Sequence, residues 1–399
     1  MTDNRKHLAT IVVVSLAFKF LFIFFSLFVL HQGFDVIDQI YYYDAGKNLL
    51  SGLVPYANFG FDYPPLAILP MALSFWITAT FEQFYNTFSL IMIFCDLVTC
   101  LCVYFIALKV FENDESTAFR AALVYATALE TCYFTLTVFD AFPTMFMMLA
   151  ILFTVCGVNS QGYLAILAGI FTKVFPLILW PFLFIYNLRE SSLMAELGIL
   201  LKYLAALGTL GILFLYVKSV GGFTWENPNV YVDTPYFTLY GFLHDILGLS
   251  WVSLSSLASS GFVALIFIEA LLVVLFFSSS DKRPRAFLKV LLLALFSFVF
   301  LWSYHSPQYI FWYFPLIAIL VADDLHSIIL FYLVQVLAFI EFPQMHLFLY
   351  SMTHYAFTLA ENPTSWYLTW GFFVVFQSLL LYLVYRAVKL DRYISLYAE

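Results

Sequence analysis

The stretch that decides the fold is residues 88–110, FSLIMIFCDLVTCLCVYFIALKV, in which Asp96 is the single charged side chain before Lys109. About 20 consecutive apolar residues allow a helix to cross the hydrocarbon core of a bilayer. Similar runs recur along the chain, and hydrophobic residues make up 63% of its 399 residues while charged residues make up 11%. A soluble domain carries about 25% charged residues. The sequence therefore predicts one all-α polytopic membrane domain, residues 1–399.

We expect about twelve transmembrane helices with a large first non-cytoplasmic loop, residues 31–86. A further apolar run, residues 66–78, is too short to span and is expected as a re-entrant or interfacial piece of that loop. The predicted spans are approximately residues 8–30, 88–110, 118–136, 143–156, 163–171, 175–185, 197–217, 254–277, 287–302, 310–321, 326–340 and 367–384.

The distribution of lysine and arginine predicts the orientation. Cytoplasmic loops of membrane proteins carry an excess of these residues. With both termini cytoplasmic, only Lys47, Lys173 and Lys218 fall outside, whereas the inner side receives Arg5, Lys6, Lys109, Arg120, Arg189, Lys202, Lys282, Arg283, Arg285, Lys289, Arg386, Lys389 and Arg392. The outer side then holds three aromatic and acidic segments, residues 31–86, 219–253 and 342–365. The net charge of −8 offers no basic patch, which argues against nucleic acid as a partner.

The first outer loop is the most informative segment for function. It places Asp35 and Asp38 directly after a predicted span, followed by a short helix over Asp38–Leu50, capped by Asp35 and ended at Gly52. Acids at the membrane surface are either solvated loop residues and helix caps or groups retained for chemistry, because desolvating a carboxylate is costly.

A series of motifs resembles a known family. The acid near the start of the loop, the Leu-Leu-Ser-Gly of residues 49–52, Pro-Tyr at 55–56 and Tyr-Pro-Pro-Leu at 63–66 look like the first loop of GT-C integral-membrane glycosyltransferases. The likeness is closest to mannosyltransferases that use a polyprenyl-phosphate sugar, including the first mannosyltransferase of glycolipid (GPI) anchor assembly and bacterial polyprenol-phosphate-mannose-dependent enzymes.

Four further segments resemble this family in its order: Phe-Cys-Asp-Leu at 94–97 with Tyr104, Phe-Asp-Ala at 139–141, the broken helix that begins Lys-Val-Phe-Pro at 173–176, and His-Ser-Pro-Gln-Tyr-Ile-Phe-Trp-Tyr at 305–313. The resemblance covers most of residues 8–320.

One departure from the family's pattern concerns a metal. Some members carry Asp-x-Asp in the first loop, whereas this chain has Asp35-x-x-Asp38. We therefore infer no metal or other cofactor, although the sequence does not exclude a divalent ion.

The resemblance implies an inverting transfer of a hexose, expected to be mannose, from a polyprenyl-phosphate donor to a lipid or glycan acceptor. Asp38 is the expected base, with Asp35 as the next candidate, since partial desolvation can bring a carboxylate pKa toward working pH. Lys173 and His305 are expected to bind the donor phosphate. The expected substrate-binding residues are Asp140, Tyr63, Gln308 and Tyr309.

Each of these residues also has a plain structural interpretation. Lys173 can snorkel to the interface, His305 can be a hydrogen-bonded turn residue, and Asp140 can be a helix N-cap. Aromatic residues such as Tyr63 are typical of interfacial belts. Asp96, in the middle of a span, is favoured as a structural acid paired with another helix.

Two other function classes remain open. A transporter or flippase of lipid-linked sugars would use the same aromatic and acidic surface without a base, and would place polar residues at mid-membrane depth. Here those residues gather in the outer loops. A non-catalytic subunit with a GT-C fold is the third reading, and an acid at position 38 argues mildly against it.

Overall fold

The computed structural model describes residues 2–25, 37–78, 80–189, 191–221, 251–302, 306–345 and 363–389, with four single residues between 239 and 246. Every regular element in these ranges is helical. The elements are α1 Thr2–Phe24, α2 Ile37–Leu50, η2 Pro65–Ala67, α3 Ile68–Ile77, α4 Phe81–Val110, α5 Glu115–Ala126, α6 Leu129–Thr137, α7 Ala141–Val155, α8 Asn159–Thr172, η3 Phe175–Leu179, α9 Trp180–Leu188, α10 Leu193–Gly221, α12 Trp251–Ser278, α13 Pro284–Leu301, η5 Pro307–Tyr309, α14 Ile310–Leu320, α15 Leu325–Phe339, η6 Ile340–Met345 and α17 Pro363–Lys389.

The helices are consistent with a polytopic membrane protein. Seven helices of the described residues are long and apolar enough to cross a bilayer, and α6 with α7 would make an eighth although they are bent by 120°. The predicted number of twelve is not confirmed. Two shorter apolar helical segments, Phe175–Leu188 and Pro307–Leu320, coincide with predicted spans and account for part of the difference. A third, Pro65–Ile77, is the apolar run expected within the first outer loop.

One predicted span is wrong in detail. The run 118–136 was expected as a single helix, but α5 ends at Ala126 and α6 begins at Leu129. Ala128 is extended, and the Thr127 hydroxyl donates to the Leu123 carbonyl while also lying 2.7 Å from the Tyr332 hydroxyl. Side-chain hydrogen bonds of this kind compete with the backbone hydrogen bonds of the helix. The chain therefore breaks inside an apolar run.

The first outer loop contains the predicted short helix, α2. Gly52 follows it with φ +86° and donates its N–H to the Leu49 carbonyl, so the helix ends where the sequence predicts. The expected cap, Asp35, lies outside the described residues. The following span starts earlier than predicted, because Thr80 caps α4 by accepting from the Gln83 N–H.

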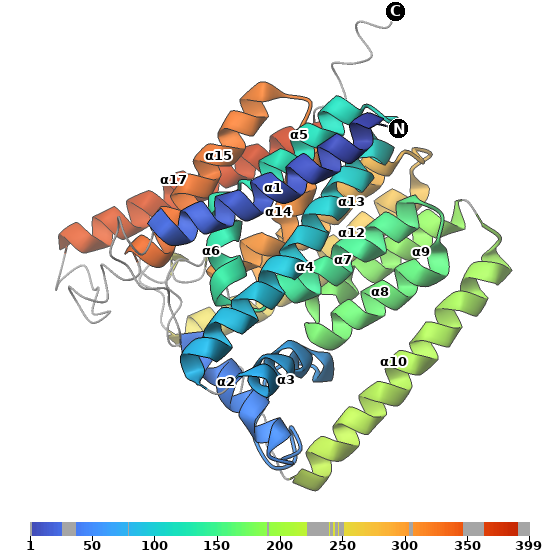
Figure 1. Ribbon diagram of the computed structural model, residues 1–399. Helices are drawn as coiled ribbons and strands as arrows, with labels where there is room; N and C mark the ends of the chain where they lie inside the picture. The colour runs from blue at the N-terminus through green and yellow to red at the C-terminus, as the bar shows by residue number, and fades with distance from the viewer. Residues whose placement is uncertain are drawn as a thin grey trace, which may run out of the picture.

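The two helices of this loop, α2 and α3, pack together at the end of the bundle away from the N-terminus (Figure 1). The contact is tight at Gly46, where an added Cβ would lie 2.6 Å from the Met71 carbonyl oxygen. Only glycine permits this separation of the two backbones. By contrast α10 stands apart from the bundle over most of its length, and it contacts the body through α8 and α9 (Figure 1).

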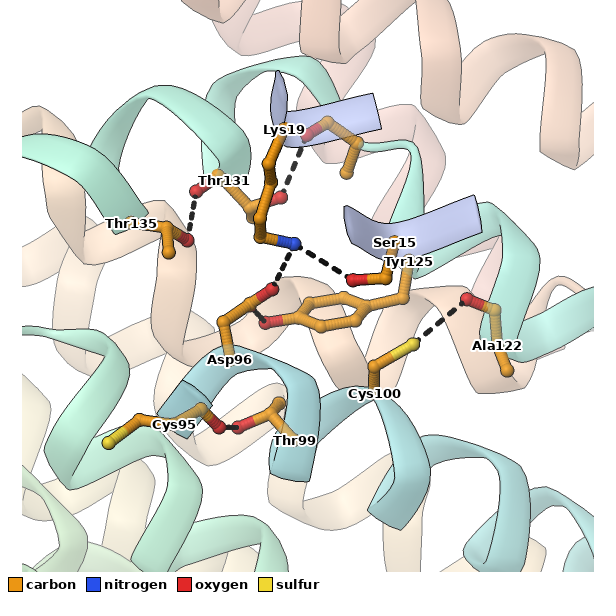
Figure 2. Close-up of polar contacts among 11 residues, drawn as sticks. Ser15, Lys19, Cys95, Asp96, Thr99, Cys100, Ala122, Tyr125, Thr131 and Thr135 are labelled. Carbon is orange, nitrogen blue, oxygen red and sulfur yellow. Dashed lines mark hydrogen bonds and ion pairs between the residues drawn. The ribbon is translucent and has the colours of Figure 1, made fainter. Parts of the chain in front are cut away.

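A buried ion pair joins α1 to the middle of the bundle. Lys19 Nζ lies 2.6 Å from Asp96 Oδ2 and donates to Ser15 Oγ, while the Tyr125 hydroxyl donates to Asp96 Oδ1 (Figure 2). Only 3% of the Lys19 side chain and 4% of the Asp96 side chain are exposed. The predicted pairing of Asp96 with another helix is therefore confirmed. We call Ser15, Lys19, Asp96 and Tyr125 the inner pair cluster.

Candidate functional site

A second buried ion pair lies at the end of α8. The helix ends at Thr172, and Lys173 takes an extended conformation there. Its Nζ lies 2.8 Å from Oδ1 and 3.0 Å from Oδ2 of Asp140. These contacts use at most two of the three N–H groups of an ammonium. The Lys173 side chain is 14% exposed whereas that of Asp140 is fully buried, so the cation is the accessible member of the pair.

Asp140 is held from two sides. It occupies the N-cap position of α7, but its side chain makes no capping hydrogen bond. Its Oδ1 instead accepts from Trp312 Nε1 at 2.7 Å, in addition to Lys173. Trp312 belongs to α14, so the carboxylate ties the α6–α7 turn to α8 and α14. We refer to Lys173, Asp140 and Trp312 as the outer triad.

Aromatic rings surround the Lys173 ammonium. Its Nζ lies 5.1 Å from the centroids of Phe139 and Trp312, 5.2 Å from that of Tyr309 and 6.0 Å from that of Tyr63. A ring within about 6 Å of a cation attracts it electrostatically. The rings therefore act together with Asp140 in holding this ammonium in place.

The rings themselves are fixed by stacking. Trp312 lies between Phe175 and Tyr309, with a centroid separation of 4.0 Å on each side. Phe175 opens η3, the start of the predicted broken helix, and Tyr309 ends η5. Two segments that the sequence separates by more than a hundred residues thus meet at one stack.

The first outer loop reaches this site through α2. Gln39 is buried, and its Nε2 donates to the carbonyl oxygen of Thr137 at 2.9 Å and to that of Leu136 at 3.4 Å. Ser89 donates to the Leu136 carbonyl from α4. These bonds hold the first turn of α2, which carries Asp38, against the end of α6. Asp140 follows that end by three residues.

Tyr63 connects Asp38 with the outer triad. Burial raises the pKa of Tyr63 well above its ordinary value, and the carboxylates of Asp38 and Asp140 raise it further. Both acids are therefore close enough to act on the same phenol, which stays protonated over the physiological range. The Tyr63 ring packs edge-on against Phe139 at 4.5 Å, and its carbonyl accepts from the Tyr56 hydroxyl.

An apolar groove of about 310 Å³ opens beside the site. It lies between the first outer loop, the end of α8 and the outlying α10. Its lining is almost entirely apolar and comprises Val54, Pro55, Tyr56, Pro65, Leu66, Phe171, Leu210 and Leu213. Phe171 precedes Lys173 by two residues, and Tyr56 donates to Tyr63. The groove is thus linked to the site through the neighbours of Lys173 and Tyr63 that line it.

The structure brings most of the predicted site residues together. Lys173, Asp140, Tyr63 and Tyr309 form one cluster, and Asp38 lies within electrostatic range of it. Gln308 is next to Tyr309 and accepts from the Ser306 hydroxyl. Asp35 and His305 lie outside the described residues.

Three residues with roles at the site were missed by the sequence analysis: Gln39, Phe175 and Trp312. The last two stand within the segments 173–181 and 305–313, so the motifs carried a signal that was not assigned to them. Gln39 gives no such signal, because its partners are backbone carbonyls about a hundred residues away. In the described part of the chain, no three or more His, Cys, Asp or Glu side chains gather in an arrangement suited to a metal ion.

Comparison with protein-family models and with curated proteins found no match for this chain.

Proposed function

We propose that this chain is a membrane glycosyltransferase that moves a hexose, mannose by the sequence resemblance, from a polyprenyl-phosphate donor to a lipid or glycan acceptor. The observation that carries the proposal is the outer triad. It presents an accessible, ring-enclosed lysine beside a loop whose first helix bears an acid, Asp38. A cation and a nearby carboxylate are the two groups that sugar transfer from a phosphate needs.

In the proposed reaction, the acceptor hydroxyl oxygen attacks the anomeric carbon as the bond from that carbon to the phosphate oxygen breaks. The bonding electrons leave with the phosphate, and the hydroxyl proton passes to the Asp38 carboxylate. The reaction is a single displacement, so the anomeric configuration inverts. Lys173 stabilises the charge that develops on the leaving phosphate, and the fixed position of its ammonium avoids reorganisation during the reaction.

Asp140 and Trp312 act as positioning residues in this scheme. Asp140 is fully buried and already bonded to Lys173 and Trp312, so it holds the ammonium while leaving an N–H for the phosphate. Tyr63 and Tyr309 both lie against the Lys173 ammonium, where aromatic rings can stack on a sugar ring. His305 remains a second candidate for the phosphate, Gln308 for the substrate, and Asp35 for the base.

The apolar groove supports a lipid-linked donor. Its lining would bury a hydrocarbon chain, and α10 is mostly exposed and apolar, as expected of a helix surrounded by lipid. A prenyl tail in the groove would bring its phosphate toward Lys173. We propose no metal and no other cofactor for the reaction.

We also propose about twelve crossings with both termini cytoplasmic and the site on the non-cytoplasmic side. The charge distribution supports this orientation. The short helices α5, α8, α9 and α14 would supply the crossings beyond the longer spans, together with the segments that continue them, such as η3 before α9 and η5 before α14.

The test is transfer by the purified full-length protein in detergent, with radiolabelled polyprenyl-phosphate-mannose or its glucosyl counterpart and a crude lipid extract as acceptor pool. We expect label to move into a new lipid or glycan, and Asp38→Asn to lower the rate by at least about 10²-fold. Asp44→Asn is the matched control, because Asp44 is an exposed acid on the same helix. Its rate should equal that of the wild type.

Three other results have distinct meanings. Transfer that survives Asp38→Asn would move the base to another residue, with Asp35 tested next. Donor binding without transfer would favour a flippase of lipid-linked sugars. A folded protein that neither binds nor transfers either donor would refute the proposal. The hypothesis of a non-catalytic subunit would then remain.

A further inference from the structure

Two buried glutamates, Glu130 and Glu341, have carboxylate oxygens without a hydrogen-bond partner. Glu130, in the first turn of α6, is fully buried, and neither carboxylate oxygen is bonded. Glu341, in η6, is 2% exposed, and its Oε1 is likewise unbonded. None of the ion pairs between described residues includes either of them. An unpaired carboxylate at this depth costs several kcal/mol, so something outside the polypeptide is expected to compensate.

The two glutamates belong to one place in the fold. The Glu130 N–H donates to Gln335 Oε1 at 2.9 Å, which brings α15 to the start of α6. Phe342, next to Glu341, packs on the rings of Tyr133 and Phe134, one turn along α6 from Glu130. The charge of Glu341 also acts electrostatically on Glu130. Two carboxylates within electrostatic range repel each other when both are charged, and either a cation between them or a proton on one of them relieves this repulsion.

The surroundings of the pair are also incomplete. Gln335 is fully buried, and its Nε2 has no partner, so a donor as well as acceptors is left unsatisfied. Its Oε1 can accept a second ligand because an amide oxygen has two lone pairs. Glu341 itself lies in a π-helical turn that is interrupted at Phe342, and such turns are frequent at functional sites.

We propose that Glu130, Glu341 and Gln335 bind a hard metal cation at the junction of α6, α15 and η6. All of the available ligand atoms are oxygens, the ligands preferred by alkali and alkaline-earth ions. Two carboxylates are too few for a complete coordination sphere, so water and backbone carbonyls would supply the rest. The Gln335 Nε2 group would donate to such a water. This site is separate from the outer triad and does not depend on the proposed transferase activity.

A cation here would hold α6 against α15. The far end of α6 accepts the bonds from Gln39 and leads into the turn of Asp140. The bound ion would therefore stabilise the helix on which the first outer loop rests.

The test measures the thermal unfolding midpoint of the full-length protein in detergent, with Na⁺, K⁺, Mg²⁺ or Ca²⁺ exchanged for choline at constant ionic strength. We expect one of these ions to raise the midpoint in a saturable way, which also identifies it. Glu130→Gln should abolish the rise, and Glu341→Gln should shift the half-saturating concentration upward by at least about tenfold. Equilibrium dialysis of the wild type with the same ion should give one ion per chain.

Glu269→Gln is the matched control. Glu269 is a half-buried glutamate of α12 that accepts from Ser297, so its variant should keep the full cation response. If Glu130→Gln does not fold, Glu130→Asp retains the charge on a shorter side chain and should show a weakened response. A wild-type midpoint that no cation changes, or a response that Glu130→Gln and Glu341→Gln both retain, would overturn the proposal. Raised midpoints in both variants without any cation effect would instead identify a protonated carboxyl pair.

Discussion

The described residues contain two buried Lys–Asp pairs, and they differ in what surrounds the lysine. In the inner pair cluster, Asp96 is bonded by Lys19 and Tyr125, and both charged side chains are shielded from solvent. In the outer triad, Asp140 is bonded by Lys173 and Trp312, but the lysine is partly exposed and enclosed by rings. The carboxylates are satisfied in the same way, by one ammonium and one aromatic donor. The inner pair only joins helices, whereas the outer pair is a candidate site because a ligand can reach its ammonium.

Double variants that remove both charges of one pair should show the largest difference between the two pairs, in the rate of transfer. Lys173→Met with Asp140→Asn removes the outer pair without leaving an unpaired charge, and should lower the transfer rate by about 10²–10³-fold because the leaving phosphate loses its cation. Lys19→Met with Asp96→Asn should leave the rate within about threefold of the wild type, since nothing at the outer triad changes. Initial rates with the labelled donor measure both. Equal losses of transfer rate in the two double variants would show that the two pairs do not differ in function.

Single variants of the two lysines should differ in how much they lower the free energy of unfolding. Lys19→Met leaves Asp96 buried with only Tyr125, and should cost about 3–5 kcal/mol of unfolding free energy. Adding Asp96→Asn should restore most of that loss. Lys173→Met should cost less, because the lysine is already partly solvated and Trp312 still donates to Asp140. Denaturation midpoints of the three variants in one detergent give the order, and a larger loss for Lys173→Met would contradict it.

Substitution of the two aromatic donors, Tyr125 and Trp312, should give the smallest difference between the two pairs. Trp312→Phe and Tyr125→Phe each keep a ring but remove one hydrogen bond to an aspartate, worth about 1.5–3 kcal/mol when the acceptor is charged. For Tyr125→Phe the loss should appear in the unfolding midpoint, with transfer unchanged.

For Trp312→Phe we expect the rate of transfer to fall by about tenfold, because the orientation of Asp140 and Lys173 relaxes and each 1.36 kcal/mol of barrier is tenfold in rate. The donor KM should change less than kcat. Trp76→Phe, at an exposed tryptophan of α3, serves as the control for a tryptophan substitution outside the triad and should retain the wild-type rate.

The sequence predicted those parts of the structure that depend on local pattern. The apolar run around Asp96, the helix that ends at Gly52 and the gathering of Lys173, Asp140, Tyr63 and Tyr309 all have local motifs. The break at Thr127 could not be predicted, since it involves a contact with Tyr332, 205 residues away. The same holds for Gln39, which bonds to backbone carbonyls that no side-chain pattern marks. Lys19 falls within the predicted span 8–30, but its partner could be named only once α1 and α4 were placed together.

The close approach at Gly46 has a consequence for motion. Because the backbones of α2 and α3 are in contact there, neither helix can slide or tilt without carrying the other. The two helices should therefore move as one rigid body, and any opening beside Asp38 must be made by bending at the ends of this body, where Thr78 and Thr80 are extended. A side chain at position 46 would act as a wedge that holds this body away from its resting position.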